Sequence, residues 1–153
     1  MPEKLKVTFD DPADGWVQLK VWSNNEVVRI VAGYTPYDSF RDLVDALYNR
    51  FLYEGESKVI WNAQPIEFEL RFGRSGSVIT LDVLEFPCYR RYEQPTMNRL
   101  SSSGSYDEIA VPFWRALRNL QGRLSTEELR ARWHRDIPAK EIEGLTSLLR
   151  KAC

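Results

Sequence analysis

The sequence predicts an α+β domain. Its antiparallel sheet has about six strands, built from two three-strand meanders separated by one helix and followed by C-terminal helices. Short segments of alternating apolar and polar residues come in two groups of three. One long amphipathic segment lies between the groups, and the last third of the chain carries helix start signals. With 153 residues, 43% of them hydrophobic, the chain is long enough to bury a core as one domain, 1–153.

The first meander is expected over residues 4–33, with strands at 4–9, 15–23 and 25–33. Pro and Gly punctuate the first turn, and Asn24-Asn25 suits a tight hairpin because Asn tolerates positive φ. The inward-facing residues of the second strand are expected to be Val17, Leu19 and Val21.

A helix is expected over residues 39–54. Its apolar residues recur at i, i+3, i+4, i+7, i+8, i+11 and i+12, which is a complete stripe along one face. Asp38 or Ser39 is suited to cap its first amides. The stripe consists of Phe40, Leu43, Val44, Leu47, Tyr48, Phe51 and Leu52.

The second meander is expected at 57–63, 65–74 and 76–86. Its middle strand alternates most regularly, so Phe68 is expected to face the core, and Glu67 and Glu69 are expected to face solvent. The other inward residues expected in this half are Leu70, Ile79, Leu81 and Val83.

After residues 1–86, which hold the sheet and the first helix, residues 87–105 lack periodicity and are predicted to be a long loop. Residues 106–153 are predicted to be mostly helical. Pro112 disfavours helix just before it, so 106–111 is predicted to be extended, although Ser105 and Glu108 also fit a capping box. Helices are then expected from Pro112, after Ser125 and after Asp136.

The composition excludes several kinds of chemistry. One histidine, His134, and two distant cysteines, Cys88 and Cys153, provide neither a zinc site nor a catalytic triad, so we expect no metal, no cofactor and no enzymatic activity. No apolar run is long enough to span a membrane, and the N-terminus has no apolar signal core. We therefore expect a cytoplasmic protein without membrane contacts.

Charge is distributed unevenly along the chain. Residues 1–86 carry 9 Lys and Arg against 14 Asp and Glu, while residues 87–153 carry 12 against 8. A total of −1 argues against nucleic acid as a partner, and the acidic first part would attract a basic protein. Alternatively, an acidic sheet simply packs beside basic helices.

The candidate partner-binding residues are the outward acidic groups and one tryptophan, namely Asp14, Trp22, Glu67, Glu69 and Asp82. Trp16 and Trp22 fall on the polar face of their strand. Either a helix or the long loop covers them, or they anchor a protein-binding surface, where Trp is enriched. For the carboxylates, the alternative is a plain solvated sheet face.

The layout resembles a bacterial family of small proteins similar to polymorphic-toxin immunity proteins. The resemblance rests on Gly15-Trp16, on the helix DSFRDLVDALYNRFL, on WNAQPIEFELRFGRSGSVITLDVLEF and on LRARWHRDIPAKEIEGLTSLL. This chain has Gln64-Pro65 where the family often has Glu-Pro.

The resemblance implies a cytoplasmic protein that binds and blocks a cognate protein toxin and is a monomer when free. Two other classes remain open. The first is a homo-oligomeric or scaffold domain without catalysis. The second is an enzyme with an unrecognised site.

Overall fold

The computed structural model describes residues 5–89 and 97–152, which form a seven-stranded antiparallel sheet and five helices. The strands lie side by side in chain order: β1 (Lys6–Phe9), β2 (Trp16–Ser23), β3 (Glu26–Gly33), β4 (Gly55–Asn62), β5 (Glu67–Ser75), β6 (Val78–Phe86) and β7 (Met97–Gly104). The helices are α1 (Ser39–Leu52), α2 (Tyr106–Ile109), α3 (Val111–Arg123), α4 (Thr126–Trp133) and α5 (Ala139–Lys151). The predicted α+β fold class is confirmed.

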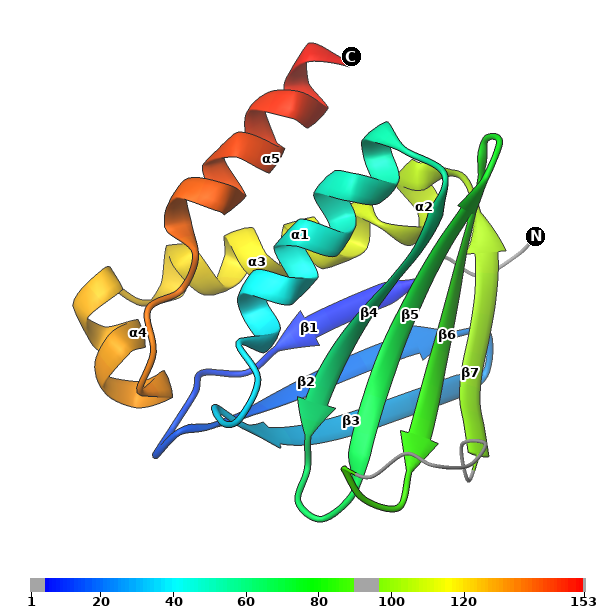
Figure 1. Cartoon of the computed structure of the whole chain (residues 1–153). Helices are drawn as coiled ribbons and strands as arrows, with labels where there is room; N and C mark the ends of the chain where they lie inside the picture. Colours follow the sequence, from blue (N-terminus) through cyan, green and yellow to red (C-terminus); the bar gives the residue numbers. More distant parts are fainter. Residues whose placement is uncertain (1–4, 90–96, 153) are drawn as a thin grey trace.

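The sheet consists of two halves, β1–β3 and β4–β7, joined at a single residue pair, Gly33 with Asn62. Asn62 strengthens this junction because its Nδ2 donates a hydrogen bond to the carbonyl of Thr35 at 2.7 Å. Strands β1–β3 run crosswise to β4–β7, and α1 and α3 lie in the angle between the halves (Figure 1). We call the faces toward α1 the inner faces and the opposite faces the outer faces.

The inner faces of both halves pack on the helices, β4 mainly on α1 and β1 mainly on α3, and together they form one core. All but one of the residues expected to face inward are buried, including Val17, Leu19, Val21, Leu43, Leu47, Phe68, Leu70, Ile79, Leu81 and Val83. The exception is Ile66, which the alternation predicts to face inward at the start of the middle strand but which precedes β5 and is 37% exposed. The alternating pattern therefore predicted the strand faces correctly in both meanders, because each strand buries one face against the helices.

Phe40 occupies the centre of this core. Its ring lies 5.1 Å from the ring of Phe9 in β1, 5.5 Å from that of Trp61 in β4 and 5.2 Å from that of Trp133 in α4. Ring pairs at these distances contribute beyond the area that they bury. One side chain of α1 thus connects both halves of the sheet with the C-terminal helices.

Two predictions for the middle of the chain are wrong. Residues 97–104 of the predicted 87–105 loop form β7, and residues 106–109 of the predicted extended segment form α2. Strand β7 lacks visible alternation because only Leu100 is buried along it, and a register shift interrupts its pairing with β6. In α2 the capping box prevails, since Pro112 falls in the first turn of α3 and so does not disturb α2.

The last two helices follow their predicted start signals. Ser125 and Glu128 form a capping box before α4, and their hydrogen bonds hold the pKa of the Glu128 carboxyl below its usual value. Helix α5 packs beside α1, where Arg41 donates a hydrogen bond to Glu141 at 3.0 Å.

We predict that Phe40→Ala lowers the free energy of unfolding by about 3–5 kcal/mol, because it opens a cavity where four elements meet. Tyr48→Ala is the matched control, since Tyr48 lies on the same helix but is 37% exposed. Urea denaturation of both variants provides the measurement. Equal midpoints for the two variants would contradict the central role of Phe40.

Candidate binding face

The residues predicted to bind a partner do not gather at one site. Asp14 is exposed in the turn before β2, where its φ is +54°. Trp22 is half-buried on the outer face of β2. Asp82 is half-buried on β6 and accepts a hydrogen bond from Ser101 Oγ at 2.6 Å.

Glu67 and Glu69 point away from α1 as predicted, but the prediction that they face solvent is wrong. They are only 1% and 0% exposed. Their cross-strand partners Phe86 and Leu84 are buried as well, so the outer face of the sheet is interior here. The alternation of a strand indicates which residues share a face but not whether that face is covered.

Both carboxylates have close polar partners. Tyr37 Oη donates a hydrogen bond to Glu67 Oε2 at 2.7 Å, and the Arg71 guanidinium lies 2.7 Å from Glu69 Oε2. Buried carboxylates with such partners belong to the internal framework of the sheet. They are not available to bind a protein.

The outer face of β1–β3 is the opposite case, because none of its residues is buried. We call it the basic face. Trp16, Val27 and Val31 are 40%, 37% and 51% exposed. No outward position of the described strands β1–β3 holds Asp or Glu. The basic face consists of Lys6, Thr8, Trp16, Gln18, Lys20, Trp22, Val27, Arg29, Val31 and Gly33.

Both tryptophans of the basic face are held by neighbours in the sheet. The Trp16 ring lies over Gly33, close enough that an added Cβ would be in ordinary van der Waals contact with the ring at 3.5 Å. Lys6 Nζ lies 5.3 Å from the centre of the Trp22 ring, a cation–π contact. Trp16 is thus exposed, whereas Trp22 is half-buried.

The Trp16 end of the basic face adjoins a second group of aromatic and basic side chains. The rings of Tyr34 and His134 lie 5.0 Å apart, edge to face. Arg135 Nε donates a hydrogen bond to the Tyr34 carbonyl at 2.6 Å. The Gly15 amide donates to the carbonyl of Arg132 at 2.8 Å, which ties the end of α4 to the start of β2.

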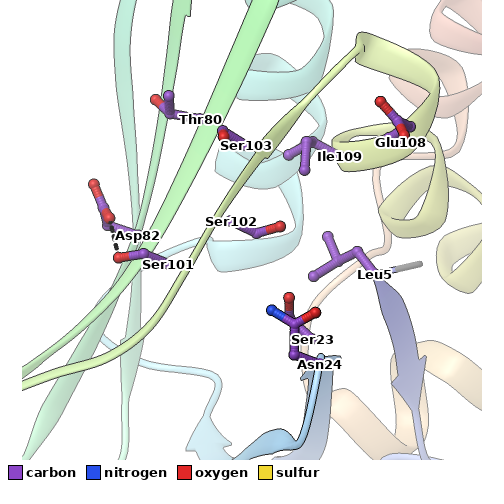
Figure 2. Close-up of a pocket in the computed structure, with 10 residues that line it drawn as sticks. All are labelled: Leu5, Ser23, Asn24, Thr80, Asp82, Ser101, Ser102, Ser103, Glu108 and Ile109. Atoms are coloured by element: carbon purple, nitrogen blue, oxygen red, sulfur yellow. Dashed lines mark hydrogen bonds between the residues drawn. The ribbon is translucent and has the colours of Figure 1, made fainter. Parts of the chain in front are cut away.

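A polar pocket of about 520 Å³ lies between the β2–β3 turn, β7 and α2 (Figure 2). Its carboxylates are already engaged, since Asp82 accepts from Ser101 and Glu108 caps α2. These cap bonds also lower the pKa of Glu108. No His, Cys or Lys is among the ten residues that line the pocket.

Within residues 5–89 and 97–152, no three His, Cys, Asp or Glu side chains gather where they would hold a metal ion. In the same part of the chain, no helix is both long and apolar enough to cross a membrane. Comparisons of the chain with protein-family models, curated proteins and solved structures found no match. The resemblance to immunity proteins therefore rests on the sequence alone.

We predict that Glu69→Lys lowers the free energy of unfolding by more than about 3 kcal/mol, because it buries an ammonium beside the Arg71 guanidinium. Glu56→Lys is the control, since Glu56 also faces Arg71 at 3.8 Å but is 56% exposed. Its effect should stay below about 1 kcal/mol. Chemical denaturation measures both changes, and similar midpoints would mean that Glu69 is accessible in solution.

Proposed function

We propose that this chain is a non-catalytic, immunity-like protein of the bacterial cytoplasm that neutralises a cognate toxin by direct contact through the basic face. The observation that carries the proposal is an open sheet face with two held tryptophan rings, two valines and three cations. Trp and Arg are the residues that most often dominate the energy of protein interfaces. The family resemblance supplies the toxin as the partner.

The area of the basic face is about half of the area that one partner buries in a stable protein complex. Three strands of this length present roughly 25 Å by 15 Å, on the order of 400 Å² in plane. A stable complex buries about 800 Å² on each partner. The partner is therefore expected to extend over the adjoining surface at Tyr34, His134 and Arg135.

The homo-oligomeric alternative is less favoured by the charge of this face. Two copies joined through it would bring Lys20 and Arg29 of one chain near the same cations of the other. Like charges across an interface weaken association. Light scattering is expected to give the mass of a monomer.

We predict that Trp16→Ala and Trp22→Ala each weaken toxin binding at least tenfold, about 1.4 kcal/mol, because both truncate a hot-spot side chain. Tyr53→Ala is the control, since Tyr53 is a 61% exposed aromatic at the end of α1, away from the basic face. The measurements are calorimetric titration with the toxin domain encoded by the neighbouring gene and survival of cells that co-express both proteins. If the wild-type chain neither binds nor protects against that toxin, the proposal fails.

A further inference from the structure

The charges of the basic face are not neutralised within the chain. Lys20 and Arg29 lie directly opposite each other on β2 and β3. Neither has an ion-pair partner among the described residues. Like charges in such a cross-strand pair destabilise a sheet. This arrangement therefore lowers the stability of the free protein.

Several cations elsewhere on the described chain do have a carboxylate partner. They are Arg41, Arg71, Arg99, Arg123 and Arg130. Lys58 on β4 also lies opposite an arginine, Arg71, but that arginine contacts the carboxylates of Glu56 and Glu69. Within residues 5–89 and 97–152, the Lys20–Arg29 pair of the basic face is the one cross-strand pair of cations without such a counter-charge.

The order of side chains on the basic face indicates which chemical groups a complementary surface would present, and where. On β3, Arg29 lies between Val27 and Val31, and on β2, Lys20 lies between the two tryptophans. Trp22 follows Trp16 by six positions, which corresponds to about 20 Å along an extended strand. A matching surface has carboxylates at its centre and apolar groups at both ends.

We infer that the partner presents an acidic protein surface to the basic face, with carboxylates between Lys20 and Arg29 and apolar side chains over Trp16, Trp22 and the valines. The inference rests on the proposed function and specifies the partner of that same site. It reverses the charge expected from the sequence, in which an acidic sheet would meet a basic toxin. The acidic residues behind that expectation include Glu67 and Glu69, which are buried.

A single-stranded nucleic acid is the other polyanion to consider. Its affinity depends on many phosphate contacts and on aromatic rings that stack successive bases. The basic face has three cations, and aliphatic Val27 and Val31 stand where a third and a fourth ring would be needed. The apolar and charged groups together favour a protein.

The decisive variant is Lys20→Glu, which replaces the repulsive cross-strand pair with an attractive one. It is expected to raise the denaturation midpoint and to weaken binding of the neighbouring toxin domain at least tenfold, with slower association and a weaker dependence on salt. A merely structural role for Lys20 would not combine a more stable fold with weaker binding. Lys20→Gln, which only removes the charge, is expected to show a smaller loss of affinity.

Lys58→Glu is the matched control, because it changes the same charge on a strand outside the basic face and should leave affinity unchanged. The proteins are titrated with the toxin domain and with a twenty-residue oligothymidylate at two salt concentrations. If the wild type binds the toxin and Lys20→Glu binds it equally well, the inference is wrong and the proposed function stands. Tighter binding of the oligonucleotide than of the toxin would assign the face to nucleic acid. If the wild type does not bind the toxin at all, both proposals fail.

Discussion

The packing of Phe40 against Phe9, Trp61 and Trp133 is the interaction on which the rest of the architecture depends. The two halves of the sheet share only the pair Gly33–Asn62, so backbone hydrogen bonds do little to fix the angle between them. Side-chain packing must fix it instead, because interiors are close-packed and resist deformation. The ring of Phe40 touches a residue from each half, and Trp133 extends the contact to α4. The bend then encloses the inner faces around α1 and separates the two outer faces.

The two outer faces have opposite character for a physical reason. The outer face of β5 is covered, and charges can be buried there only with partners such as Tyr37 and Arg71. The outer face of β1–β3 is open, so its cations remain hydrated and need no internal counter-charge. The repulsion between the charges of Lys20 and Arg29 is modest in water, so the free chain tolerates this cross-strand pair. Carboxylates of an acidic partner placed between Lys20 and Arg29 would attract both cations and so offset their mutual repulsion.

Local patterns predicted the parts of this fold that depend on local chemistry. Alternation identified six strands and nearly every inward residue, and the apolar stripe identified α1, because burial of one face imposes these periods. The seventh strand was missed because its sequence has no alternating apolar pattern. Its serines pair with β6 through the backbone, and only Leu100 is buried. The site was mislocated for a different reason. Glu67 and Glu69 looked exposed because a sequence does not reveal which outer face other segments cover. Trp16 and Trp22 were recognised as anomalous, but their openness depends on tertiary structure.

The construction of the basic face also determines how it can bind. Its side chains project from paired strands, and both tryptophan rings rest on neighbours, Trp16 on Gly33 and Trp22 beneath Lys6. The contacts of the two tryptophan rings limit the side-chain freedom that these rings lose when a partner arrives, which reduces their share of the entropic penalty of association. Electrostatic attraction begins before the two surfaces touch. Uncompensated cations on an open face attract an acidic surface from about a Debye length away, roughly 8 Å at physiological salt. Both properties fit the proposed function, in which the protein must capture a toxin quickly and hold it. The cations Lys6, Lys20 and Arg29 would speed the encounter, and the apolar side chains would hold the partner.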